Sequence, residues 1–249
     1  MLKWNAVSVL FTRQRSLLTM MPKYSAEDMM QSVNFSYGGH NFQLYTHNHP
    51  DHLFNVITAE KSFYELDLLV KAKEVYTPGS VIVDIGANIG NHTVFFAKVL
   101  NAPVLAFEPF DKNREILREN LRVNDCTDFV RIESLALGDF QGRGRAVIPT
   151  TANYGMVNIQ PDPNGDIQIA RLDDYITEQT PLSIVKMDVE GGELGVLRGA
   201  TETLRRQKPH LFIEAGELAY FMEIQKYLAD FGYQVRGRYC HTATYHFSV

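Results

Sequence analysis

The chain has 249 residues, 45% of them hydrophobic, and a formal net charge of −5. This length suits one α/β domain with additions, and the negative charge argues against a general nucleic-acid-binding surface. No apolar run is long enough to span a bilayer, so no transmembrane segment is expected. The two cysteines, Cys126 and Cys240, provide neither a disulfide framework nor a cysteine zinc site, which favours a reducing, cytoplasmic location.

The N-terminal segment, residues 1–23, contains four basic residues and no acid. It has no continuous apolar core followed by small residues, so a secretory signal is not expected. Its composition weakly resembles an organelle transit segment. The favoured interpretations are a helix packed on the domain, or sequence upstream of a true start at Met20 or Met21.

A strand is predicted at residues 41–45, and a histidine-rich segment follows it. The segment matches the H-x-H-x-D-H motif of metallo-β-lactamase-type hydrolases through His47, His49, Asp51 and His52. Imidazoles and a carboxylate would suit zinc or iron. Since the further ligands of that fold lack their pattern here, the segment is interpreted as a polar loop that could place one histidine over the site. No metal site is predicted, and a metal-dependent hydrolase using these four residues remains an alternative.

A strand, a glycine turn and a helix are predicted in succession after a helix at residues 63–76. Val81, Ile82 and Val83 are typical of a strand buried on both faces, and residues 92–100 have the apolar spacing of a helix. The turn between them has glycines at 86 and 90, with Asp84 two residues before the first. A carboxylate there would repel a pyrophosphate but would suit the ammonium and sulfonium of S-adenosylmethionine.

Glu108 follows the next short apolar strand, residues 103–107, about 20 residues after the glycine turn. An acid at that distance is placed to accept hydrogen bonds from ribose hydroxyls. An amphipathic helix with Asp111 as its N-cap is then predicted at residues 111–123, and a third strand at residues 129–137.

The β-α alternation breaks at residues 141–166, which are rich in glycine, proline and asparagine. An insertion or β-hairpin is expected, and Asn153, Tyr154 and Met156 are candidates for acceptor contact. Residues 171–174 then start a short helix.

Asp188 ends the apolar strand predicted at residues 183–187, and Glu190 follows in the turn. Ligands in open α/β sheets bind at the carboxyl ends of the strands, so Asp188 should face the reacting group. The alternative for these acids is helix capping, which fully explains Glu193 but not a charge at the end of a buried strand. A fifth strand ending at Glu214, a helix at residues 218–231 and a terminal hairpin complete the pattern.

Three ordered motifs resemble the FkbM-type S-adenosylmethionine-dependent methyltransferases, from about Tyr64 to Ala215. They are VDIGANIGNHT at 83–93, AFEP at 106–109 and IVKMDVEGGELGVLRGA at 184–200. The resemblance implies an α/β fold with a Rossmann-like, seven-stranded class I sheet, helices on both faces and a closing antiparallel pair. It also implies S-adenosyl-L-methionine as cofactor and O-methylation of a sugar or natural-product hydroxyl.

The expected domains are an N-terminal extension and cap at 1–61 and a methyltransferase domain at 62–249. The resemblance assigns a Tyr64-Glu65 pair to the helix that covers the cofactor side of the sheet. Asp188 and Glu190 are the candidates for acceptor binding or catalytic base, with His47, His49 and His92 less favoured. A divalent metal between Asp188 and Glu214 is conceivable but not required, and a non-catalytic protein that only binds the cofactor is a second alternative. The predicted cofactor-binding residues are Asp84, Gly86, Ala87, Asn88, Gly90, Asn91, Thr93, Glu108, Pro109, Ala136, Leu137 and Asp188.

Overall fold

The short apolar runs form the strands of a seven-stranded sheet in the computed structural model, which describes residues 30–47, 52–147 and 157–249. The strand order is β12-β13-β11-β10-β3-β4-β5. The parallel strands are β3 (Val81–Ile85), β4 (Val104–Phe107), β5 (Val130–Glu133), β10 (Leu182–Met187) and β11 (His210–Glu214). The terminal hairpin, β12 (Gln234–Tyr239) and β13 (Thr244–Ser248), joins antiparallel at β11. This sheet confirms the predicted class I architecture.

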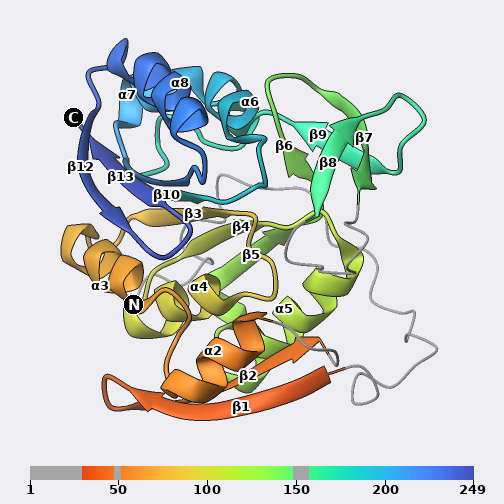
Figure 1. Cartoon of the computed structure of the whole chain (residues 1–249), viewed down its shortest axis with the longest axis vertical. Coiled ribbons are helices and arrows are strands. Elements are labelled where there is room, and N and C mark those ends of the chain that lie inside the picture. The colour runs from red at the N-terminus through yellow and green to blue at the C-terminus, as the bar shows by residue number, and fades with distance from the viewer. Residues whose placement is uncertain (1–29, 48–51, 148–156) are drawn as a thin grey trace.

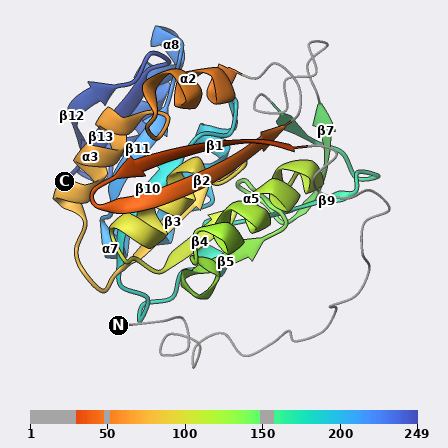
Figure 2. The same cartoon turned by 90° about the horizontal axis from the view of Figure 1, so that it is seen from below.

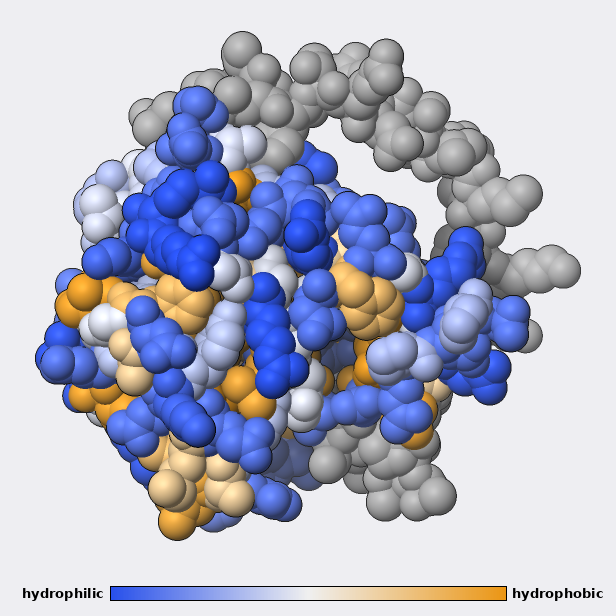
Figure 3. Space-filling model, turned by 90° about the horizontal axis from the view of Figure 1, so that it is seen from above, coloured by the Kyte–Doolittle hydropathy of each residue, from blue (hydrophilic) through white to orange (hydrophobic). Residues whose placement is uncertain are grey.

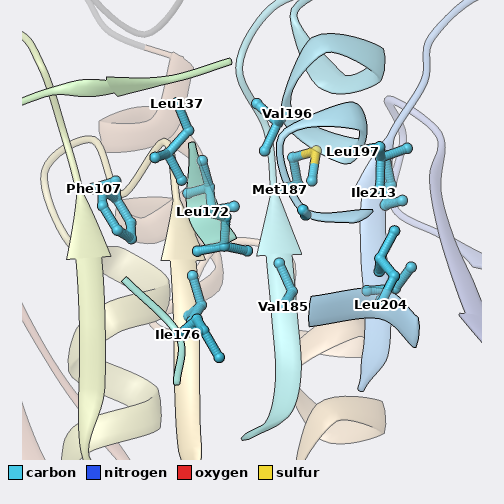
Figure 4. Packing of buried hydrophobic residues seen from close by; sticks show 14 of the residues in the cluster. Phe107, Leu137, Leu172, Ile176, Val185, Met187, Val196, Leu197, Leu204 and Ile213 are labelled. Carbon is cyan, nitrogen blue, oxygen red and sulfur yellow. The ribbon is translucent and has the colours of Figure 1, made fainter. Parts of the chain in front are cut away.

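Helices cover both faces of this sheet (Figure 1). One face carries α3 (Leu66–Val75), α4 (Asn91–Val94) continued by a π-helical turn at Phe95–Val99, and α5 (Asp111–Val123). The other carries α6 (Glu193–Arg198), α7 (Thr201–Gln207) and α8 (Leu218–Ala229). Buried side chains form one apolar cluster on each face, because strands alternate their side chains between the two sides. Figure 4 shows the cluster beneath α6 and α7, where Val185 and Met187 of β10 meet Val196 and Leu197.

An N-terminal hairpin and a short helix add a further layer below α3–α5 (Figure 2). The hairpin consists of β1 (Met30–Tyr37) and β2 (His40–His47), and the helix is α2 (His52–Glu60). Phe35 and Phe42 of the hairpin pack against Phe63, with ring centroids 4.9 and 4.7 Å from that ring. The hairpin therefore shares its core with the helices of the sheet.

A second, four-stranded sheet replaces the end of the predicted third strand. β5 ends at Glu133, opposite Phe107, because β4 ends there and offers no further partner. The chain turns and β6 pairs with β9 instead, so the prediction of one strand over 129–137 was wrong. The order of this sheet is β6-β9-β7-β8, formed by β6 (Ala136–Leu137), β7 (Gly142–Val147), β8 (Asn158–Pro161) and β9 (Ile167–Ala170). The acceptor candidates Asn153, Tyr154 and Met156 lie outside the described residues.

The start of α5 also differs from its prediction. Phe110 is the N-cap residue, and Asp111 is the first helical residue, ion-paired with Arg114. The Phe110 amide donates instead to Glu108, 2.8 Å away, so a carboxylate from the preceding strand end serves the helix start. Short 3₁₀ turns lie at Thr127–Phe129 and Leu172–Asp174, the latter at the predicted short helix.

The described surface offers no extended apolar face in the view of Figure 3, where hydrophobic residues form small patches among hydrophilic ones. Within the described ranges, no helix combines the length and apolar character needed to cross a membrane.

Candidate active site

Two adjoining cavities open at the carboxyl ends of the parallel strands. They lie where β3 and β10 are neighbours. From β3 the next strands in the sequence are added toward β5, and from β10 they are added on the opposite side, toward β11. This is the position at which open α/β sheets bind ligands. The larger cavity, of about 790 Å³, lies beside the ends of β3, β10 and β11, and the smaller, of about 80 Å³, beside β3 and β4. Both are lined by Gly86, Asn88, Asp188 and Glu190. They are therefore two parts of one site.

The glycine turn needs its glycines for close packing. Gly86 has a φ of 75°, and a Cβ there would lie 1.8 Å from the carbonyl oxygen of Asp188. Gly90, with a φ of 88°, begins α4, and a Cβ there would lie 2.4 Å from Leu117. A side chain at Gly86 would push the turn away from β10, and one at Gly90 would displace the Leu117 side chain and strain the left-handed backbone. Ala87 and Asn91 line the larger cavity, whereas Gly90 lines neither.

Glu108 is buried at the smaller cavity and holds the loops around it. Its carboxylate accepts the amides of Asn88 and Phe110, both at 2.8 Å. Burial raises the pKa of Glu108 to about 7, although these hydrogen bonds oppose the shift. Three apolar residues predicted from the sequence line this cavity with it: Pro109, Ala136 and Leu137. Phe107, which was not predicted, lines it too.

Asp84 occupies a different place from the one predicted. It is fully buried, lines neither cavity, and accepts a 2.6 Å hydrogen bond from Thr93. Its second oxygen lies 3.8 Å from the Lys186 ammonium, because Asp84 and Lys186 are register partners on adjacent strands. Asp84 and Thr93 therefore lie behind the turn and outside both cavities.

Asp188 is the partly exposed acid at the junction of the cavities. Lys186 lies 3.4 Å from it and donates to the carbonyl of Gly86 at 3.3 Å. Burial opposes the charge of Lys186, but the carboxylates of Asp188 and Asp84 outweigh burial and raise its pKa. Glu214, at the end of the neighbouring strand β11, lines the larger cavity together with Asp188. Burial and the charge of Asp188 raise the pKa of Glu214 to about 9, which favours its protonated form at neutral pH.

Glu190 and Glu193 take different roles in the turn after β10. Glu190 has a left-handed φ of 56°, lines both cavities, and has a pKa raised to about 7 by burial and by Asp188. Glu193 accepts the amides of Val189 and Gly191 at 3.0 and 3.3 Å. Such bonds satisfy amides that would otherwise be unpaired, so Glu193 shapes the turn.

A second wall of the larger cavity comes from the start of α3. Asn91 exchanges two hydrogen bonds with the backbone of Tyr64, at 3.1 and 3.0 Å. Glu65 has a left-handed φ of 58° and lies 3.3 Å from His92. Tyr64, Glu65, Asn91 and His92 all line the larger cavity. Their contacts join the helix after the glycine turn to the start of α3.

The histidine-rich segment is divided between separate places. His47 is buried and bonded to Asn113, whereas His52 begins α2 and lines the larger cavity. His49 and Asp51 lie outside the described residues. Among the residues that the structure describes, no group of three or more His, Cys, Asp or Glu side chains is arranged to hold a metal ion.

Several residues of the site were not assigned to it from the sequence, among them Lys186, Asn113 and Tyr220. Lys186 lies inside an apolar strand. The sequence signal for it is a lone positive charge there, with Asp84 near the end of one neighbouring strand and Glu214 at the end of the other. Asn113 lines the smaller cavity, and Tyr220 lines the larger and donates to the carbonyl of Gly191 at 3.0 Å. Neither has a local sequence signal.

The comparisons with known proteins agree with this geometry. The Methyltransferase FkbM domain model matches residues 84–235. The chain belongs to the FkbM methyltransferase family. It is 26% identical over 190 residues to the methyltransferase sdnD of Sordaria araneosa, covering 62% of this chain and 73% of that protein.

A solved structure shares the fold. The crystal structure of methyltransferase FkbM from Methylobacillus flagellatus superposes with a TM-score of 0.53 at 23% identity. The match covers 69% of this chain but 44% of that one, so the two share the fold over less than half of the longer protein. The resemblance to FkbM proteins drawn from the motifs is confirmed by the family match.

Proposed function

We propose that this protein is an S-adenosyl-L-methionine-dependent O-methyltransferase whose acceptor is a hydroxyl group of a sugar or other small natural product. The observation that carries the proposal is the pair of adjoining cavities that meet at Asp188, one with a buried carboxylate and apolar walls, the other large and acidic. A cofactor and a separate acceptor would each have a compartment, with their reacting groups brought together at the junction.

The residues of the smaller cavity suit the nucleoside part of the cofactor. Glu108 offers carboxylate oxygens for ribose hydroxyls, and the apolar surfaces of Phe107, Ala136 and Leu137 suit a flat adenine ring. Asn88, at the junction, would hold the methionine part. When bound, the cofactor supplies an electrophilic methyl group on its sulfonium.

The charge of the larger cavity restricts the acceptor. Carboxyl groups of Glu65, Asp188, Glu190, Glu214 and Glu217 line it, and the positive charge of Lys186 is already shared by Asp84 and Asp188. Phosphorylated or carboxylated acceptors would meet the negative charge of the ionised carboxylates there. Neutral polyhydroxylated or amine-bearing acceptors would find hydrogen-bond acceptors instead.

Asp188 is proposed as the group that takes the proton from the acceptor hydroxyl. Lys186, at 3.4 Å, compensates the carboxylate charge and holds it in place. Glu214, whose raised pKa favours its protonated form, lines the same cavity. A positioned base of this kind contributes most when the nucleophile must lose its proton in the transition state.

The experiment is a methyl-transfer screen with S-adenosylmethionine labelled in the methyl group. Neutral sugars, aminosugars and hydroxylated metabolites would be offered beside phosphorylated and carboxylated counterparts of the same compounds. Transfer to a hydroxyl of an uncharged or amine-bearing compound is expected. Transfer only to nitrogen or carbon, or a preference for the anionic counterparts, would contradict the proposal.

A further inference from the structure

The turn after β10 is held from the second sheet as well as from within. Asn158, the first residue of β8, donates from its side-chain amide to the carbonyl oxygen of Glu190 at 2.5 Å. In the same peptide unit, the N–H of Gly191 donates to the carboxylate of Glu193 at 3.3 Å. Both polar groups of the peptide between Glu190 and Gly191 are therefore bonded, and one of the partners belongs to the other sheet.

This peptide needs support because the backbone around it is strained. Glu190 has a φ of 56°, a left-handed conformation that costs free energy in a residue with a side chain. Such a residue keeps its conformation only where the surrounding structure fixes it. Gly191, with a φ of 95°, can adopt negative φ as readily, so the peptide between the two residues could flip if its bonds were lost. The bond from Asn158 opposes that flip.

Asn158 reaches the site only through this turn. Glu190 lines both cavities, whereas Asn158 lines neither. Val157 and Ile159, on either side of Asn158 in the chain, line the smaller cavity together with Glu190. From α8, Tyr220 donates to the carbonyl of the next peptide at 3.0 Å. The turn that carries Glu190 is thus bonded both to the second sheet and to α8.

We propose that Asn158 is a positioning residue that holds the carboxyl group of Glu190 at the junction of the two cavities, where it binds the acceptor. The inference rests on the proposed function, in which the acceptor occupies the larger cavity. Without the bond from Asn158, the peptide flips and Glu190 relaxes to a negative φ. A change of φ redirects the side chain relative to the chain, so the carboxyl group leaves the junction. The second sheet, which lies outside the seven-stranded core, then belongs to the active site.

The pKa of Glu190 reveals where its carboxyl group lies. Burial and the charge of Asp188 raise this pKa from 4.5 to about 7, and both causes weaken when the group leaves the junction. Carbon NMR titration of protein labelled at the glutamate carboxyl carbons measures the pKa, and Glu190→Gln identifies the signal. We expect Asn158→Ala to lower the pKa of Glu190 toward 4.5. Asn158→Gln, which restores an amide donor, should recover part of the shift.

Gln160→Ala is the matched control, because Gln160 is an exposed residue of the same strand. It should leave the pKa of Glu190 unchanged. Methyl transfer to the acceptor that the screen identifies gives a second readout. Asn158→Ala should raise the KM for that acceptor about tenfold, the effect of roughly one hydrogen bond to a charged group, and should change kcat less.

Four results would overturn the inference. They are an unchanged pKa of Glu190 in Asn158→Ala, an equal fall in Gln160→Ala, a wild-type pKa near 4.5, and an unchanged KM for the acceptor in Asn158→Ala. A wild type that transfers no methyl group would overturn the proposed function, and the titration would still decide whether Asn158 positions Glu190. If Asn158→Ala does not fold, Asn158→Leu removes the donor, fills more of the space and carries the same test.

Discussion

Asp188 stands where the two cavities meet, and the proposed chemistry depends on its ability to take a proton. Asp188→Asn keeps the shape of the side chain but cannot act as a base. We expect methyl transfer to fall by roughly 10²–10⁴-fold, the contribution of a positioned general base. Cofactor affinity and the free energy of unfolding should change little. The measurements are initial rates with an identified acceptor and calorimetric titration with S-adenosylhomocysteine.

A purely structural role predicts another result for this variant. Asparagine caps a helix about as well as aspartate, so a capping role would leave both stability and turnover intact. Glu193→Gln is the comparison, because Glu193 bonds the amides of its own turn. It should lower stability more than Asp188→Asn does. Full activity of Asp188→Asn would move the search for a base to Glu190 and His52, which also line the larger cavity.

Glu214 gives the site a predictable dependence on pH. Its pKa rises from 4.5 to about 9 on folding, so the folded state binds this proton more tightly than the unfolded chain does. That stabilisation is fully present below the unfolded pKa and is lost as the pH rises toward 9. The raised pKa values of Glu108 and Glu190 also make stability fall as the pH rises, but only up to about pH 7.

The interval from about pH 7 to 8.5 therefore isolates Glu214. The wild type should lose stability there, by at most about 1.4 kcal/mol per pH unit. Glu214→Gln, which cannot titrate, should have a flatter profile. Denaturant unfolding at several pH values measures both. Parallel profiles for the two proteins would mean that Glu214 does not hold a proton in the folded state.

At the scale of elements, Asn120 connects three segments. Its fully buried amide bonds the backbone of Tyr45 in β2 and donates to the carbonyl of Ile89 in the glycine turn at 2.7 Å. Asn120→Ala leaves these backbone groups unpaired. We expect a loss of roughly 2–4 kcal/mol in the free energy of unfolding, because each unsatisfied buried group costs about 1–3 kcal/mol.

Asn41→Ala is the matched control for Asn120→Ala. Asn41 is an exposed asparagine of the same hairpin and accepts a hydrogen bond from Ser36 at the surface. Its replacement should change the free energy of unfolding by less than about 0.5 kcal/mol. Denaturant unfolding curves measure both variants. Equal effects of the two replacements would show that the asparagine contacts do not fasten the hairpin.

The elements that carry a local signal could be predicted, and those that depend on distant partners could not. The strand before Asp84 and the helix at 111–123 follow from apolar runs and helical spacing. The attachment of β2 to α5 joins residues about 75 positions apart, and single asparagines reveal nothing of it in the sequence. The third strand was predicted too long, because its pairing ends where β4 ends rather than where its own apolar residues do.

For the whole molecule, the sequence predicts the location of the site better than it predicts the direction in which each acidic side chain points. Glu108, Asp188 and Glu214 each follow or end a parallel strand, and Asp84 is the last residue but one of β3, so their common edge could be inferred from topology. Their directions depend on neighbours in space. Asp84 turns inward because Lys186 lies beside it on the adjacent strand, and the pKa of Glu214 is raised by burial and by the charge of Asp188.

The central claim is that the smaller cavity binds the nucleoside end of S-adenosylmethionine through Glu108. Calorimetric titration of S-adenosylhomocysteine into the wild type and Glu108→Ala tests it most directly. We predict binding to the wild type, and weaker binding to Glu108→Ala by roughly 1–3 kcal/mol, the usual cost of a lost hydrogen bond to a charged group. No binding to the wild type at millimolar ligand, or equal affinity in both proteins, would contradict the account.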